Sequence, residues 1–75
     1  MTHAHRIDAT QAQIIATLRR TGAFVFDCSR LGGGFPDLFV VSRGQTYLLE
    51  VKAPGGRLTL REREFIDLCP MPVHV

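Results

Sequence analysis

The feature that most constrains the fold of this chain is a pair of apolar runs joined by a short turn. The runs "DLFVVSR" (37–43) and "TYLLEVKA" (46–53) are rich in aliphatic and aromatic residues, and "GQ" between them is typical of a tight turn. We therefore expect two antiparallel strands in a hairpin. Both runs also carry charge that a plain core strand would lack, because Asp37 opens the first while Glu50 and Lys52 interrupt the second.

The segment before this hairpin predicts one helix and one strand. Residues 7–21 have apolar side chains at roughly helical spacing, with Asp8 or Thr10 as a possible N-cap and Gly22 at the end. The short segment 23–28, "AFVFDC", is rich in residues that favour β-structure and predicts a strand.

The segment after the hairpin predicts a second helix and a last strand. In "LTLREREFIDLC" (58–69), Thr59 and Glu62 have the spacing of a capping box. Prolines then stop the helix, and 73–75 reads as the opening of a strand that returns parallel to the third strand through a crossover. The order α-β-β-β-α-β predicts an α/β fold with a mixed sheet.

Length and composition indicate a minimal single domain over residues 1–75, with 1–6 as a flexible N-terminal segment. A domain of this size buries only about 60% of the surface of its unfolded chain, so we expect a homodimer. Cys28 and Cys69 lie far apart and no secretory signal precedes them, which favours a cytoplasmic protein without disulfides. The apolar runs are far too short to span a membrane.

The charges of the hairpin indicate a metal site. Residues two apart on a strand face the same side, so Glu50 and Lys52 point together, and Asp37 opens the neighbouring strand. Two carboxylates side by side repel each other, a cost that a divalent cation reverses. Mg²⁺ prefers a few carboxylate oxygens, with water and phosphate completing its coordination.

Lys52 is the only lysine among nine basic residues, which suggests a position whose chemistry requires an ammonium group. Beside a metal it would orient or deprotonate the attacking water, or stabilise negative charge on a phosphate, and the chemistry implied is metal-assisted phosphodiester hydrolysis. Plainer readings stay open. In these alternatives, codon usage explains the arginine-rich composition, Asp37 serves only as a turn residue after Pro36, and Glu50 with Lys52 forms a solvent-facing strand edge.

The pattern "PD" at 36–37 followed by "EVK" at 50–52 resembles the PD-(D/E)xK nuclease signature. Together with "GGGFPDLFVV", "LLEVKAPGGRLT" and "REREF", it is similar to the small stand-alone VRR-NUC type, the virus-type replication-repair nucleases, over roughly residues 8–75. The resemblance implies a restriction-endonuclease-like fold. It also implies a nuclease activity that depends on Mg²⁺ or Mn²⁺ and on no organic cofactor.

The same resemblance implies roles for individual residues. Asp37 and Glu50 would be metal ligands, the carbonyl of Val51 a third, and Lys52 would act on the water or the transition state. Relatives commonly carry an acidic residue on the first helix, where this chain has glutamine, and we take Gln13 as the matching catalytic position.

Four further residues are candidates for contacts with nucleic acid. Gly34 ends a glycine run that would let a nucleic-acid backbone approach Asp37, although an ordinary loop explains it equally well. Phosphate contacts are expected from Arg30, Arg57 and Arg61. Arg61 lies among alternating charges, so a salt-bridged helix surface explains it at least as well.

The sequence therefore predicts a metal-dependent DNA endonuclease. The resemblance points to structure-selective cleavage of junctions, flaps or branched DNA, in phage or bacterial DNA repair and recombination, and hence in the cytoplasm of a bacterial or phage-infected cell. One alternative is a catalytically inactive DNA-binding or assembly module on the same fold. A second is a sequence-specific restriction-type endonuclease, for which 75 residues leave little room for base reading.

Overall fold

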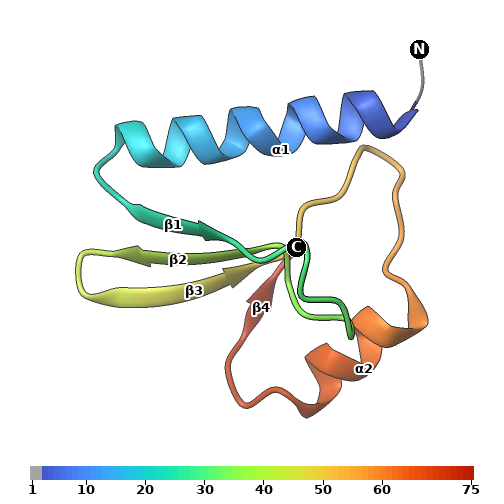
Figure 1. Ribbon diagram of the computed structural model, residues 1–75. Coiled ribbons are helices and arrows are strands. Elements are labelled where there is room, and N and C mark those ends of the chain that lie inside the picture. Colours follow the sequence, from blue (N-terminus) through green and yellow to red (C-terminus); the bar gives the residue numbers. More distant parts are fainter. Residues whose placement is uncertain (1–2) are drawn as a thin grey trace.

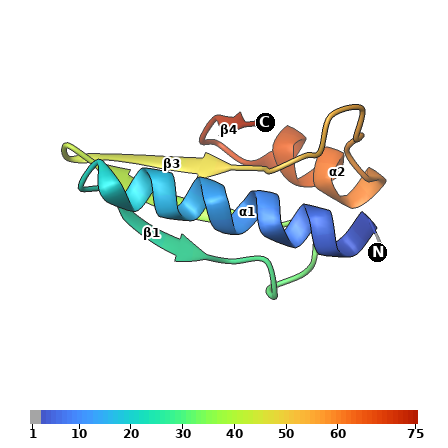
Figure 2. The same cartoon turned by 90° about the horizontal axis from the view of Figure 1, so that it is seen from above.

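A computed structural model describes the backbone of residues 3–75 and the side chains of residues 10–75. A four-stranded mixed sheet, in the order β1-β2-β3-β4, forms the centre of the molecule. One helix, α1, runs along one face of the sheet, and α2 lies beyond the edge where β3 and β4 meet the connecting loops (Figures 1 and 2). The elements are α1 (His3–Arg20), β1 (Phe24–Asp27), β2 (Leu38–Ser42), β3 (Gln45–Leu49), α2 (Leu60–Leu68) and β4 (Val73–His74). This order confirms the predicted α/β class and topology.

The first helix is longer than the sequence pattern predicted. Helix α1 begins at His3, so Asp8 and Thr10 lie inside it and neither caps its start. The segment before Asp8 contains no proline or glycine, and nothing in it stops the helix from extending towards the N-terminus. The helix takes up residues 3–6 of the segment predicted to be flexible, whereas residues 1–2 lie outside the described part of the chain. The predicted end at Gly22 is confirmed by its positive φ of 92°.

The hairpin between β2 and β3 turns one residue earlier than expected. Ser42 pairs with Gln45, so the turn residues are Arg43 and Gly44 rather than Gly44 and Gln45. Both have positive φ, 52° and 77°. A two-residue turn of this kind fits the right-handed twist of the strands, and glycine takes its second position readily.

The third strand is shorter than the predicted segment 46–53, because β3 ends at Leu49. The N–H of Glu50 still donates to the carbonyl of His74 in β4, over 2.7 Å. The next N–H, that of Val51, donates to the Asp37 carboxylate instead of to a strand. The charged segment therefore leaves the sheet directly after β3. Strand β4 runs parallel to β3, as predicted.

The core lies between α1 and one face of the sheet. Val25, Leu38 and Val40 are buried there, and Leu38 has no exposed surface. Partly buried side chains of α1 pack against them, namely Ile14, Ile15 and Leu18. Alternation along β1 turns Phe24 and Phe26 to the opposite face, where more than half of each side chain is exposed.

Helix α2 begins as the sequence predicted. The Thr59 hydroxyl accepts a hydrogen bond from the Glu62 N–H, and the Glu62 side chain accepts one from the Thr59 N–H, which completes a capping box. Cys69 ends the helix, and both cysteines are free thiols. Within the described residues, neither helix combines the length and apolar character needed to cross a membrane.

Candidate active site

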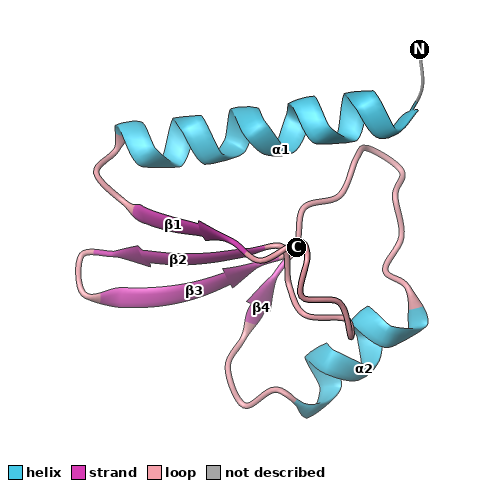
Figure 3. Cartoon of the chain, in the orientation of Figure 1, coloured by secondary structure: helices cyan, strands magenta, loops and turns pink. Residues whose placement is uncertain are grey.

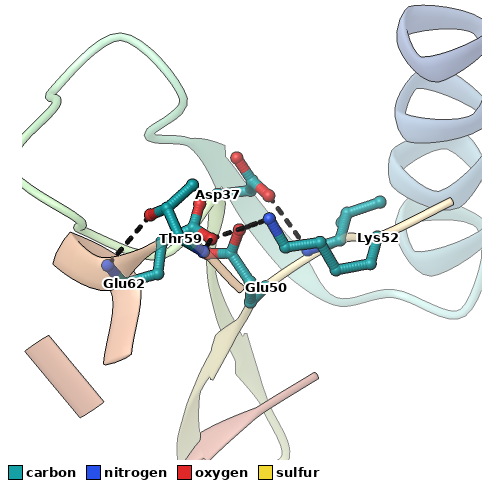
Figure 4. A network of polar contacts seen from close by, with 6 residues as sticks. Asp37, Glu50, Lys52, Thr59 and Glu62 are labelled. Carbon is teal, nitrogen blue, oxygen red and sulfur yellow. Dashed lines mark hydrogen bonds and ion pairs between the residues drawn. The ribbon is translucent and has the colours of Figure 1, made fainter. Parts of the chain in front are cut away.

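Strand pairing brings the two predicted metal ligands together. Leu38 opposes Leu49 in the antiparallel pair β2-β3, so the residues next to them, Asp37 and Glu50, flank the same end of the hairpin. Strands β1, β3 and β4 end here and β2 begins here, so strand ends form this edge of the sheet. The β2-β3 turn lies at the opposite edge (Figure 3). Figure 4 shows the Asp37, Glu50 and Lys52 side chains gathered here, with Thr59 and Glu62 beside them.

Asp37 is held by contacts on two sides. Its backbone carbonyl accepts the N–H of Cys28 at 2.7 Å, which ties it to the end of β1. Its carboxylate Oδ2 accepts the N–H of Val51 at 2.9 Å, which ties it to the segment after β3. Pro36, the residue before it, is fully buried. Asp37 therefore has a fixed position at the centre of the sheet edge, and it joins segments that a simple turn residue would leave apart.

Glu50 is buried, with 5% of its surface exposed, which rules out the reading as a solvent-facing strand edge. Burial raises its pKa from 4.5 to about 7, with further upward contributions from hydrogen bonding to Glu62 and from the negative charge of Asp37. Lys52, whose Nζ lies 3.4 Å from Glu50 Oε2, offsets only part of this effect. The protein thus holds a carboxylate in a position that disfavours its charge, and a cation would relieve that cost.

Lys52 bridges two carboxylates. Its Nζ donates to Glu62 Oε1 at 2.7 Å and lies near Glu50, and 22% of the lysine side chain remains exposed. Burial by itself would lower the pKa of Lys52. The hydrogen bond to Glu62 and the charges of Glu62 and Glu50 outweigh burial, so the pKa lies above its ordinary value. Lys52 is accordingly an ammonium group throughout the neutral range.

Glu62 is the member of this site that the sequence pattern did not assign to it. The pattern predicted its capping role, and the structure adds the contact with Lys52. Burial pushes the pKa of Glu62 upwards, but the hydrogen bonds from Lys52 and from the Thr59 N–H outweigh it, and the pKa lies below its ordinary value. The capping-box spacing was the available signal, because it aims the N3 side chain back towards the start of the helix.

The donor atoms suit a hard divalent cation that retains most of its water. Among the described residues no three histidine, cysteine, aspartate or glutamate side chains form a metal-binding group. The set that the family resemblance implies is the carboxylates of Asp37 and Glu50 with the backbone carbonyl of Val51. Mg²⁺ is commonly bound through one or two carboxylates, with water and substrate phosphate as its other ligands, so this set fits it. A hollow of about 240 Å³ adjoins the set, lined in part by Glu50, Val51 and Lys52.

Gln13 is not brought to these residues. It lies exposed on α1 and lines a shallow hollow with its helix neighbours Thr10, Ile14, Thr17 and Leu18. The adjacent Ile14 is the α1 side chain that lines the hollow beside Glu50. Gln11, the other glutamine of this segment, donates to Asp27 at 3.3 Å. The structure therefore gives Gln13 no contact with the acidic pair.

The residues predicted to contact nucleic acid differ in their surroundings. Arg30, Arg57 and Arg61 are all exposed. Gly34 packs against α2, where a Cβ would overlap the backbone carbonyl of Arg61, and its φ of +81° also favours glycine. Glycine at this position is thus required by the packing of the loop on α2. Arg61 also lines a hollow of about 500 Å³ between α2 and the loop at Gly33.

Comparison with known protein families matches residues 2–71 to the VRR-NUC domain. No curated protein and no solved structure matches the chain. The matched range contains Asp37, Glu50 and Lys52 as well as the capping box of α2, so it includes every side chain drawn together in Figure 4. The chain therefore belongs to the VRR-NUC family of nuclease domains.

Proposed function

We propose that this chain is an endonuclease that hydrolyses phosphodiester bonds of DNA with Mg²⁺ or Mn²⁺ as cofactor. The observation that carries the proposal is the convergence of Asp37, the buried Glu50 and the Lys52 ammonium at one edge of the sheet. Membership of a nuclease domain family supports the same activity.

The carboxylates of Asp37 and Glu50 and the carbonyl of Val51 would hold the cation. When bound, it supplies Lewis-acid polarisation of the phosphate and a water of lowered pKa. Asp37 keeps one carboxylate oxygen on the Val51 N–H, which fixes the orientation of the other oxygen. Burial around Glu50 strengthens the attraction between its carboxylate and any cation beside it.

Lys52 acts in this proposal as a charged donor and not as a base. Its ammonium lies between two carboxylates, so loss of its proton would remove a cationic partner from each of them. Its place beside the hollow suits stabilisation of the negative charge that develops on a phosphate during hydrolysis.

The substrate is proposed to be branched DNA, such as junctions or flaps, in bacterial or phage DNA repair and recombination. A net charge of +2 over 75 residues favours recognition of backbone and shape over the reading of base sequence. The prediction of a homodimer rests on the small core of the domain, and sedimentation of the native chain measures it.

The test is cleavage of labelled duplex, flap and four-way junction DNA with Mg²⁺ or Mn²⁺, and with EDTA. We expect metal-dependent cutting, fastest on a branched substrate, that Asp37→Asn and Lys52→Ala each reduce by at least ~100-fold. Arg20→Gln is the matched control for loss of one positive charge. Arg20 lies at the end of α1 and bonds Thr17, so this variant should cut like the native chain.

Three outcomes would refute the proposal. Cleavage that continues in EDTA, or that survives loss of Asp37, would place the chemistry elsewhere. Binding of DNA without cleavage under either metal would favour the inactive binding module, an alternative that the exposed position of Gln13 already supports.

A further inference from the structure

We infer that the capping box of α2 positions the active-site lysine, which makes Glu62 and Thr59 positioning residues for Lys52. The inference rests on the proposed function for its effect on activity. Its structural content is independent, because it concerns which group holds the ammonium of Lys52.

One oxygen of Glu62 serves the helix and the lysine together. Oε1 accepts the Thr59 N–H at 2.8 Å and the Lys52 Nζ at 2.7 Å (Figure 4). The Thr59 hydroxyl in turn accepts the Glu62 N–H at 3.1 Å, which fixes the backbone of the first helical turn. The carboxylate therefore reaches Lys52 in an orientation that the helix cap sets.

Glu62 is the nearer partner of Lys52 and would become its main partner if Glu50 held a cation. In the structure the ammonium is closer to Glu62 than to Glu50, at 2.7 Å against 3.4 Å. A Glu50 carboxylate that turns its oxygens to a cation has less to offer the lysine. Glu62, whose other hydrogen bond is to the helix cap, would keep Lys52 beside the site.

The first turn of α2 is itself anchored to the loop that leads to Asp37. Gly34 fits against the Arg61 carbonyl with no room for a Cβ, and the ring of Phe35 meets that of Phe65 edge-on at 5.2 Å. Helix α2 thus supports the segment before Asp37 and, through Glu62, holds Lys52. This arrangement links the two sides of the site.

The first measurement is an NMR experiment on the lysine ammonium group of the full chain, with and without Mg²⁺. Lys52 is the only lysine, so its side-chain ammonium signal needs no assignment among others. We expect a slowly exchanging signal in the native chain and in Thr59→Ser, which keeps the hydroxyl. The signal should broaden or disappear in Glu62→Ala and weaken in Thr59→Val. Glu64→Ala is the matched control on the same helix and should leave it unchanged.

The second measurement is the kinetics of DNA cleavage by the same variants. Loss of positioning should lower kcat by ~10- to 100-fold in Glu62→Ala with little change in KM, because Glu62 acts through Lys52 and not on bound DNA. Glu62→Gln keeps an oxygen for the Thr59 N–H but removes the charge that holds Lys52. It should therefore keep the native melting temperature and still lose kcat, which a purely structural role would not produce.

An ammonium signal that is equally protected in the native chain and in Glu62→Ala would overturn the inference, as would native kcat in Glu62→Gln. The proposed function fails separately. If the native chain cuts no DNA but the signal of Lys52 still depends on Glu62 and Thr59, the positioning contact stands and the activity does not.

Discussion

Replacement of Glu50 by glutamine should change the pH dependence of stability in a defined direction. The raised pKa means that the folded, metal-free protein keeps a proton on Glu50 that the unfolded chain has released between pH 4.5 and about 7. The contribution of Glu50 to stability is therefore fully present below pH 4.5 and is lost as the pH rises through that window. Glutamine at this position has a similar shape and does not titrate.

The size of the effect follows from the shift. A rise from 4.5 to about 7 corresponds to about 3 kcal/mol of unfolding free energy. Because Glu50 is almost fully buried, solvent screens little of this energy. The unfolding free energy of the native chain, relative to Glu50→Gln, should thus fall by about 3 kcal/mol between pH 4 and pH 8.

The assay is urea unfolding of both proteins in EDTA at several pH values from 4 to 8. Comparison of the two chains cancels the contribution of carboxylates outside the site, such as Asp27. Glu64→Gln, at an exposed position on α2, is the matched control for the same exchange outside the site. A difference between the native chain and Glu50→Gln that stays constant with pH would refute the reasoning, because it would mean that Glu50 ionises in the fold as it does in water.

Three further predictions test the metal site, the loop and the core. At pH 8, Mg²⁺ at 100 times its Kd should stabilise the native chain by about 2.7 kcal/mol in thermal unfolding and Asp37→Asn far less, whereas equal shifts would exclude Asp37 as a ligand. Gly34→Ala should cost about 1–3 kcal/mol in urea more than Gly33→Ala, whose Cβ meets no atom within 4 Å, and equal costs would contradict the close packing on Arg61. Leu38→Ala should cost about 2–5 kcal/mol, and a cost under 1 would show that Leu38 is not central to the core.

Local patterns determined most of the fold. Alternation and turn residues located the hairpin, and the spacing of Thr59 and Glu62 located the start of α2. Such features depend on neighbours a few residues apart, so the chain reveals them directly. The helix start at His3 was missed for the same reason. Asp8 and Thr10 are plausible capping residues, and they placed the predicted start too far along the chain.

The same local logic placed the charges of the site, since residues before one strand and after the next must meet if the two strands pair. Asp37 and Glu50 meet in that way. The end of β3, by contrast, depends on a hydrogen bond between separate segments. The Val51 N–H donates to the Asp37 carboxylate and not to a strand carbonyl. Which acceptor is in reach depends on how the chain returns in space.

By itself, the sequence determined the order of the elements, the acidic pair and the single lysine. The tertiary structure decided that Glu50 is buried, that Gln13 lies exposed without a contact to the acidic pair, and that Glu62 holds Lys52. Burial and contacts between separate segments depend on how α1, the sheet and α2 pack together. A pattern along the chain specifies the side chains, and only the packed molecule specifies the distances between them.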